Sequence, residues 1–269
     1  MDIVAFKLGP FTVHWYGVLL ALGFLVGLWT AGRRGLRVGV APEKVWDAGV
    51  WLIVGSVLGA RLLYVISYWK ESFAGKHWSE VFMIHHGGLV YYGGLMGACL
   101  AFVLYATVKR LALWNLADIL APSISLGYAI GRNGCLMNGC CYGRPTDLPW
   151  AVHFPMDHPT GGVGVHPTQV YESLAALVLY LVLAWLFRRR QFQGQVFASY
   201  LIGYAILRSS VEFFRGDYPA HYLGGWATPA HLISMVMIMT GLALWWVLRR
   251  GRDALRAHPL PKHRHDQGR

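Results

Sequence analysis

The stretch VWLIVGSVLGARLLYVISYW, residues 50–69, indicates the class of fold to expect for this chain. It is apolar almost throughout and has the length of about 20 residues that an α-helix needs to cross a bilayer. Its one charged side chain, Arg61, lies near the middle. A charge inside a membrane is costly and usually serves a function, so this stretch predicts a membrane-spanning helix with a functional polar residue.

Apolar windows of similar length recur along the whole chain. The sequence is 55% hydrophobic and 14% charged, whereas soluble domains have about 25% charged residues. The expected fold class is therefore an all-α polytopic membrane protein. Its seven predicted transmembrane helices are Val13–Ala31, Val50–Trp69, Val90–Val108, Leu116–Ile130, Val170–Phe187, Val196–Phe214 and Ala227–Val247.

The chain is strongly basic, and the distribution of the charge indicates topology. It has 24 Lys and Arg residues against 13 Asp and Glu residues. Clusters of Lys and Arg follow the first, third, fifth and seventh predicted helices, so every second loop is basic. Under the positive-inside rule the N-terminus lies outside the cell and the C-terminus inside. Because topology accounts for the charge, we expect no nucleic-acid partner.

One membrane domain, residues 1–250, is expected, with residues 134–167 inserted in it as a small head on the outer side. These inserted residues are rich in Gly, Pro, His and Asp, which makes them too polar for lipid, and they are too many for a plain turn. Residues 251–269 form a basic tail near the inner leaflet, for which we expect no regular structure. No internal repeat is visible in the sequence, which disfavours an inverted-repeat transporter.

Charged and polar residues gather in the outer half of the predicted helices. In GYAILRSSVEFFR, residues 203–215, four of them recur every three or four positions, which puts them on one helix face. One interpretation is a structural ion pair between Arg208 and Glu212. The other is a site for an anionic headgroup, because a guanidinium binds phosphate through two hydrogen bonds. The number of charged residues in this half favours a lipid phosphate as ligand. These residues are Arg132, Glu172, Arg208, Glu212 and Arg215.

Glycines are concentrated in HHGGLVYYGGLMG, residues 85–97, where two Gly–Gly pairs surround Tyr91 and Tyr92. Glycine has no side chain beyond the Cα atom, so a ligand or another backbone can come close to it. Small residues are equally expected where two helices pack tightly in a membrane. The sequence leaves both interpretations open.

Six motifs occur in order along the chain. They are HWYG at 14–17, LGARLLYV at 58–65, GGLVYYGGLMG at 87–97, GR-x-G-x4-G-x3-G at 131–143, HPTQVYES at 166–173 and GYAILRSSVEFFR at 203–215. Together they resemble the prolipoprotein diacylglyceryl transferase family, and they cover the first six predicted helices. The most specific pieces are HPTQVYE and R-x3-EFFR.

The resemblance implies a seven-helix enzyme of the bacterial inner membrane with a periplasmic head, an N-terminus in the periplasm and a C-terminus in the cytoplasm. Such an enzyme transfers the diacylglyceryl group of phosphatidylglycerol to the thiol of the lipobox cysteine in a prolipoprotein and releases glycerol phosphate. The implied partners are phosphatidylglycerol, other anionic phospholipids and prolipoprotein signal peptides. We expect a monomer with no cofactor and no metal ion.

The resemblance also implies roles for residues at matching positions. Arg132 and Arg208 would act as catalytic residues that bind the lipid phosphate, and Glu212 would orient Arg208. Tyr16 and Tyr204 match tyrosines of the family's site. The other residues expected to bind substrate are Arg61, Asn138, Gly143, His166, Gln169, Glu172 and Arg215.

Two features depart from the family pattern. Before the second Gly–Gly pair the family has a histidine, the natural base for the acceptor thiol, and this chain has Tyr92. The ordinary pKa of tyrosine is about 10, so Tyr92 would serve as the catalytic base only if arginines lowered that pKa; otherwise the arginine charges alone would activate the thiol. In the signature around the cysteines, Cys135 replaces an asparagine and Cys140 a glutamate.

Three cysteines, Cys135, Cys140 and Cys141, crowd into GRNGCLMNGCCYG, residues 131–143. On the oxidising side of an inner membrane we expect a structural disulfide between Cys135 and one of the later two. The alternatives are inert thiols, a zinc site helped by histidines nearby in sequence, and a cysteine that carries the lipid covalently.

Other functions stay open beside the transferase interpretation. One is a relative of the family with a different phospholipid donor or a different acceptor. Another is a thiol–disulfide or metal-handling membrane protein built around the cysteines. A third is a transporter, or a protein that binds phospholipid and leaves it intact.

Overall fold

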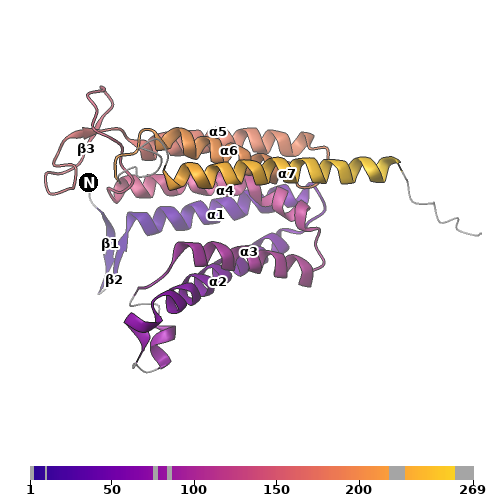
Figure 1. Ribbon diagram of the computed structural model, residues 1–269, viewed down its shortest axis with the longest axis horizontal. Coiled ribbons are helices and arrows are strands. Elements are labelled where there is room, and N and C mark those ends of the chain that lie inside the picture. The colour runs from indigo at the N-terminus through magenta and orange to yellow at the C-terminus, as the bar shows by residue number, and fades with distance from the viewer. Residues whose placement is uncertain (1–2, 10, 75–77, 84–86, 218–227, 258–269) are drawn as a thin grey trace, which may run out of the picture. The chain divides into compact units, whose positions relative to one another are not determined.

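The computed structural model describes residues 3–9, 11–74, 78–83, 87–217 and 228–257. The helices formed by these residues are α1 (Trp15–Leu36), α2 (Pro42–Ser67), α3 (Tyr91–Val108), α4 (Leu113–Met137), α5 (Thr168–Arg189), α6 (Gln195–Glu212) and α7 (Pro229–Ala257), as labelled in Figure 1. Each predicted window overlaps one of these helices, although α2 begins eight residues before its window and α4 and α7 end seven and ten residues after theirs. Five of these helices, α1, α2, α3, α5 and α7, are long and apolar enough to cross a membrane. The chain is therefore a multi-pass membrane protein.

The chain divides into two units, and each is described by itself. The first unit consists of Met1–Gly27 with Leu120–Arg269, and the second of Leu28–Ile119. The long helices α1 and α4 each begin in one unit and end in the other.

In the second unit, α2 and α3 pack against each other through glycines. A Cβ atom added at Gly59 would clash with the carbonyl oxygen of Gly93, and one at Gly97 would clash with that of Gly55. Side chains at these positions would push the two backbones apart, as in other membrane helix pairs with small residues at the interface. The structure thus gives the second Gly–Gly pair a packing role. Two short helical segments, η1 (Trp69–Phe73) and η2 (Trp78–Phe82), follow α2.

In the first unit, a small apolar core joins α4, α5 and α6. It consists of the buried residues Ala129, Ala176, Leu207 and Val211. Small side chains at an interface bring helix backbones close together, so polar residues one turn away on each helix can meet. The ring of Tyr128 packs against this core. The seventh helix lies along α6, where Gly241 faces Ile202.

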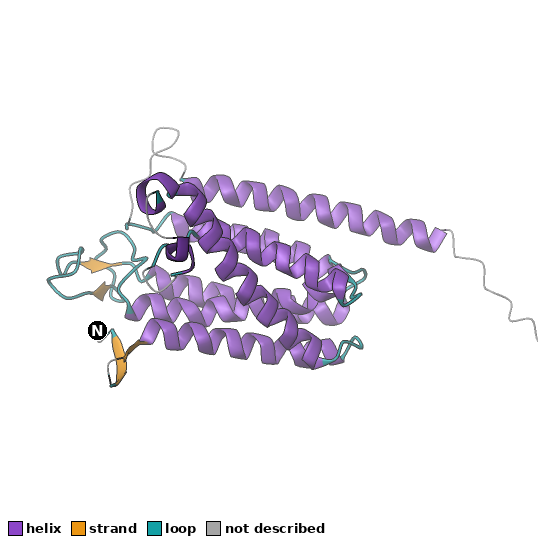
Figure 2. Ribbon diagram, turned by 90° about the horizontal axis from the view of Figure 1, so that it is seen from below, coloured by secondary structure: helices purple, strands orange, loops and turns teal. Residues whose placement is uncertain are grey.

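Residues 138–167 connect α4 to α5, and we call them the head segment. It contains two short antiparallel strands, β3 (Val152–His153) and β4 (Gly164–Val165). A second antiparallel pair, β1 (Val4–Leu8) and β2 (Phe11–His14), forms a hairpin before α1. Figures 1 and 2 show the hairpin and the head segment at the same end of the first unit. This hairpin was not predicted from the sequence.

Two helices extend seven residues or more beyond their predicted ends. The first is α4, which continues to Met137 and so carries both Arg132 and Cys135, although the head was expected to begin at residue 134. The other is α7, which continues to Ala257, past the start of the tail for which no regular structure was expected. Polar helix ends leave no hydropathy signal, and Ala, Arg and Leu in this tail favour helix. Residues 258–269 lie outside the described residues.

Candidate active site

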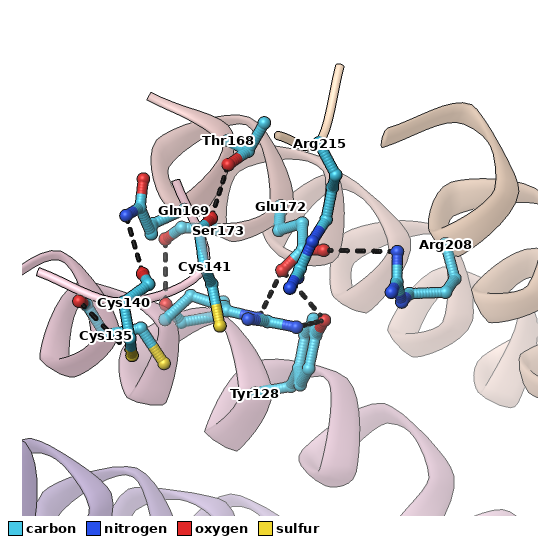
Figure 3. A network of polar contacts seen from close by, with 12 residues as sticks. Tyr128, Cys135, Cys140, Cys141, Thr168, Gln169, Glu172, Ser173, Arg208 and Arg215 are labelled. Atoms are coloured by element: carbon cyan, nitrogen blue, oxygen red, sulfur yellow. Dashed lines mark hydrogen bonds and ion pairs between the residues drawn. The ribbon is translucent and has the colours of Figure 1, made fainter. Parts of the chain in front are cut away.

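Polar residues of three helices in the first unit form a connected set, which we call the arginine–glutamate network (Figure 3). It consists of Tyr128 and Arg132 on α4, Glu172 on α5, and Arg208 and Glu212 on α6. Glu172 lies at its centre. Its Oε2 forms an ion pair with Nε of Arg132 and accepts a hydrogen bond of 3.1 Å from the Tyr128 hydroxyl. Its Oε1 lies 3.9 Å from Nη1 of Arg208.

Arg208 is held along its own helix as well. Its Nη1 donates to Oε2 of Glu212 at 2.5 Å, one turn further along α6. The ion pair between Arg208 and Glu212, one of the two interpretations that their four-residue spacing allows, is thus present. The side chains of Glu172 and Glu212 are each 1% exposed, whereas those of Arg132 and Arg208 are 13% and 16% exposed. The buried carboxylates therefore fix two guanidinium groups that still reach the surface of the unit.

Tyr128 holds Arg132 from the side. Its hydroxyl accepts a hydrogen bond of 2.6 Å from Nη2 of Arg132 while donating to Glu172. The ring of Tyr204 meets that of Tyr128 edge to face, with centroids 5.4 Å apart. Tyr204, which the family resemblance assigned to the site, thus lies directly beside the network.

Arg215 follows the end of α6 and points towards Glu172 in Figure 3. Its Nε and Nη2 donate to the two carboxylate oxygens of Asp217 at 2.9 and 2.6 Å. Asp217 was not predicted from the sequence, where it lies in a loop without a periodic pattern. The pairing of a third guanidinium with a third carboxylate leaves the whole cluster close to formal neutrality.

Cys135, at the end of α4, and Cys140 and Cys141, just after it, form a compact turn, residues 135–141, which we call the cysteine turn. The thiols of all three are free in this structure, so the expected disulfide is not formed in it. Hydrogen bonds with the Cys135 and Cys140 thiols, and then the charges of Arg215 and Arg132, lower the pKa of the Cys141 thiol despite its partial burial. The cysteine turn and the arginine–glutamate network are therefore neighbours.

Tyr16, at the start of α1, lies close to the cysteine turn. A Cβ atom added at Gly134 would contact the backbone and ring of Tyr16 at 3.2 to 3.4 Å, so the glycine makes room for α1. The phenol is also close enough for electrostatic interaction with all three cysteines and with Arg132. The structure thus brings Tyr16 to the predicted site.

The predicted head-side residues have mainly structural contacts. Gly143 leaves no room for a side chain, because a Cβ atom there would meet the backbone oxygens of His166 and Phe214 at 2.6 and 2.8 Å. The His166 ring stacks edge to face on Tyr171 and Phe214. Gln169 is buried and donates to the carbonyl of Cys140 at 2.7 Å. Asn138 is exposed at the beginning of the head segment. Substrate contacts of these residues stay predictions.

Two predicted site residues, Arg61 and Tyr92, belong to the second unit. The guanidinium of Arg61 donates hydrogen bonds of 2.7 to 3.1 Å to the carbonyls of Glu80, Val81, Gly87 and Gly88. It thereby ties the segment after α2 back to that helix. Tyr92 is 57% exposed, and its ring contacts that of Tyr91. The roles predicted for both residues in substrate binding and catalysis stay predictions.

The first unit therefore holds the groups needed to bind an anion. The guanidinium groups of Arg132, Arg208 and Arg215 lie close together in this unit, and buried carboxylates orient two of them. A guanidinium presents several N–H donors to a phosphate in a fixed plane. Such donors, fixed before a ligand arrives, stabilise charge that develops on a leaving group.

The family of this chain follows from comparison with known proteins. The model of the family described as prolipoprotein diacylglyceryl transferase matches residues 3–247. A relative in Chromohalobacter salexigens is 38% identical over 263 residues, which cover 95% of this chain and 96% of the relative. Another in Geobacillus kaustophilus is 37% identical over 263 residues, 96% of each chain. A third, in Synechococcus elongatus, is 36% identical over 252 residues, 90% of this chain and 86% of the relative.

Each of these three relatives is named phosphatidylglycerol–prolipoprotein diacylglyceryl transferase. The matches extend over nearly the whole chain, including all helices that carry the arginine–glutamate network. The chain belongs to the prolipoprotein diacylglyceryl transferase family.

Proposed function

We propose that this protein transfers the diacylglyceryl group of phosphatidylglycerol to the thiol of the lipobox cysteine of prolipoproteins and releases glycerol phosphate. The observation that carries the proposal is the identity of 36 to 38% with transferases of that name over at least 90% of this chain. The arginine–glutamate network supplies the chemistry that such a reaction needs.

The transfer joins a sulfur atom to carbon. The acceptor thiol loses its proton, and its thiolate forms a bond to the terminal carbon of the diacylglyceryl group. The bond between that carbon and the phosphate oxygen breaks, and the electron pair leaves with glycerol phosphate. The phosphate therefore gains negative charge during the reaction, and fixed positive charges beside it lower the barrier.

Arg132 and Arg208 are the residues we assign to that phosphate. Arg132 uses Nε and Nη2 for its contacts with Glu172 and Tyr128. Within the described part of the chain its Nη1 has no hydrogen-bond partner, so this edge of the guanidinium is available to a phosphate oxygen. Glu212 orients Arg208 through their 2.5 Å contact. Tyr16 and Tyr204 flank the site, and Tyr92 is the candidate base.

We also propose a placement in the bacterial inner membrane. All seven helices would span it, including the more polar α4 and α6, with the head segment and the N-terminus in the periplasm and the C-terminus in the cytoplasm. This orientation is supported by the basic residues Arg188–Arg190 at the far end of α5 from the head segment. The protein would act as a monomer, with residues 1–250 as its membrane domain and with phosphatidylglycerol and signal peptides as its partners.

The test is a mass-shift assay with the purified protein in vesicles that contain phosphatidylglycerol and a lipobox peptide. We expect a diacylglyceryl adduct on the peptide cysteine, and a rate about 100-fold to 1,000-fold lower for Arg208→Ala, because one stabilising donor for the developing charge is lost. Arg189→Ala is the matched control, since Arg189 is exposed at the end of α5. It should leave the rate unchanged. No adduct with phosphatidylglycerol or with any other phospholipid tested would overturn the proposal.

A further inference from the structure

The cysteine turn contains an arrangement of atoms that the proposed reaction leaves unused. The Sγ atoms of Cys135, Cys140 and Cys141 all lie within 4.8 Å of one another, as Figure 3 illustrates. All three side chains are partly exposed, so an ion from solution and a further ligand can reach the sulfur atoms.

The turn is held in place without any bond between the sulfurs. Three successive carbonyl groups each accept a hydrogen bond from a side chain outside the turn. His158 donates to Gly139 at 2.7 Å, Gln169 to Cys140 at 2.7 Å, and Thr168 to Cys141 at 2.5 Å. His158 is itself stacked on Phe154 with ring centroids 4.4 Å apart. The sulfurs are therefore preorganised by the head segment and the start of α5.

A metal ion would use all three sulfurs, whereas a disulfide would use two of them. A disulfide requires two of them to approach to about 2.05 Å and leaves the third out. Zinc binds thiolates at about 2.3 Å, which puts the sulfurs of a tetrahedral site about 3.8 Å apart. Sulfurs that already lie within 4.8 Å of one another need to move by about 1 Å or less to reach that geometry.

We propose that Cys135, Cys140 and Cys141 bind one Zn²⁺ ion, and that the fourth position of this ion receives the acceptor thiol of the peptide substrate. The second half of this inference rests on the proposed function. Among the residues that the structure describes, no His, Asp or Glu joins the three sulfurs. Three protein ligands and one open position are the arrangement of catalytic zinc, whereas structural zinc has four protein ligands.

The reaction gives such an ion a role. A thiol that binds zinc is deprotonated, because the metal stabilises the thiolate. The acceptor thiol would give its proton to water and bind as thiolate. Its sulfur would then form the bond to the diacylglyceryl carbon while the carbon–oxygen bond breaks and its electron pair leaves with glycerol phosphate. The ion is neither oxidised nor reduced. The zinc ion would thereby generate the substrate thiolate, a task for which the family has a histidine at the position of Tyr92.

The surroundings of the cysteine turn are suited to this charge. Zn²⁺ with three protein thiolates and one substrate thiolate has a net charge of about −2. Positive charge nearby stabilises such a site, and the charges of Arg132 and Arg215 both act on the sulfur of Cys141. Arg132 also belongs to the arginine–glutamate network. The zinc ion would thus bind the nucleophile beside the arginines that bind the leaving phosphate.

Metal binding is tested first, on the full-length, reduced, untagged protein dialysed against Zn²⁺ and analysed by mass spectrometry for zinc and sulfur. We expect about one zinc ion per chain, and less than a tenth of that in Cys135→Ser and Cys140→Ser. Cys99→Ser is the matched control, because Cys99 is an exposed free thiol on α3, and it should bind zinc as the wild type does. Reduced wild-type protein that binds no zinc, or equal binding by Cys135→Ser and Cys99→Ser, would overturn the site.

The open position is tested with Co²⁺ in place of zinc. Addition of the lipobox peptide should change the sulfur-to-cobalt absorption, and a peptide with serine in place of the cysteine should not. An unchanged spectrum with the cysteine peptide would contradict the second half of the inference.

Activity gives a readout that a merely structural zinc ion would not give. Removal of zinc by a chelator should slow transfer by about 100-fold at pH 7, and addition of zinc should restore it. At pH 9.5 the loss should shrink to below about tenfold, because a free peptide thiol with a pKa of about 8.5 ionises without help. A loss of equal size at both pH values, or no loss at either, would contradict thiol activation. Zinc binding without transfer from any phospholipid would support the metal site and overturn the proposed function.

Discussion

Arg61 and Arg132 are both arginines in apolar helices, yet different partners hold them. Arg61 in the second unit directs Nε, Nη1 and Nη2 to four backbone carbonyl groups between residues 80 and 88. Arg132 in the first unit contacts a carboxylate and a phenol instead. The hydrogen bonds of Arg61 thus go to the backbone of the protein itself. Arg132 is oriented by side chains that leave one edge of its guanidinium available.

An arginine inside a membrane protein can therefore have either of two roles. Carbonyl oxygens satisfy the donors of a guanidinium and fix a loop, and in Arg61 they take up four of the five N–H groups that could bind a ligand. Buried carboxylates fix the guanidinium and raise the local density of charge. Arg61 is therefore expected to matter for stability, and Arg132 and Arg208 for the reaction.

The largest effect is expected from Glu172→Gln, which removes the charge at the centre of the arginine–glutamate network. Two guanidinium groups would then face each other across a neutral amide, in a place where the native carboxylate is 1% exposed. Loss of one partner from a buried ion pair costs about 3–5 kcal/mol. Unfolding in mixed micelles should show a decrease of that size in the free energy of unfolding.

The matched control for Glu172→Gln is Asp253→Asn on α7. Asp253 also forms an ion pair, with Arg252, but its side chain is 52% exposed. Such a pair contributes at most about 1 kcal/mol. Equal losses of stability in the two variants would mean that Glu172 is not the buried centre of the network.

A smaller effect is expected from the paired variants Arg61→Lys and Arg132→Lys, which separate the two uses of arginine. Lysine keeps the charge but offers a compact ammonium group in place of a planar fork. In Arg61→Lys some carbonyls lose their donor, at a cost of about 1–3 kcal/mol in stability, with little change in the rate per folded molecule. In Arg132→Lys the rate of diacylglyceryl transfer should fall by about 100-fold while the melting temperature changes little.

Thermal unfolding and initial rates, measured on the same preparations, check this pair. In the opposite pattern, Arg61→Lys would have a lower rate of diacylglyceryl transfer and an unchanged melting temperature. That result would support the substrate-binding role predicted for Arg61 from the sequence.

The helices and one ion pair could be predicted from the sequence because each depends on local spacing. The thickness of a bilayer sets the length of an apolar window, and a spacing of four residues puts Arg208 and Glu212 on one face of α6. The meeting of Glu172 with both arginines depends on the small residues that bring α4, α5 and α6 together. Sequence patterns place these residues in the same half of the membrane, but they do not predict the contacts.

Two partners of the predicted residues were missed for different reasons. Asp217 lies in a loop, where no periodicity assigns it to a face. Tyr128 looks like an ordinary core tyrosine in an apolar helix, although it precedes Arg132 by one turn of α4. That spacing is the signal that could have revealed it, because residues four apart on a helix are neighbours.

Tyr128 offers the smallest and most specific test of the comparison. Tyr128→Phe keeps the ring on the apolar core and removes only the hydroxyl that joins Arg132 to Glu172. We expect a loss of about 1 kcal/mol in the free energy of unfolding and a decrease of about tenfold in the transfer rate. The reason is that Arg132 keeps its ion pair with Glu172 but loses its hydrogen bond to the Tyr128 hydroxyl.

Tyr180→Phe, about two turns further along α5 than Glu172, is the control and should match the wild type. A zinc content equal to that of the wild type in Tyr128→Phe would show that the cysteine turn is intact. The lower rate would then come from Arg132 alone. If the two phenylalanine variants transfer lipid at the same rate, the carboxylate suffices to orient Arg132, and the hydroxyl serves only to satisfy the buried oxygen of Glu172.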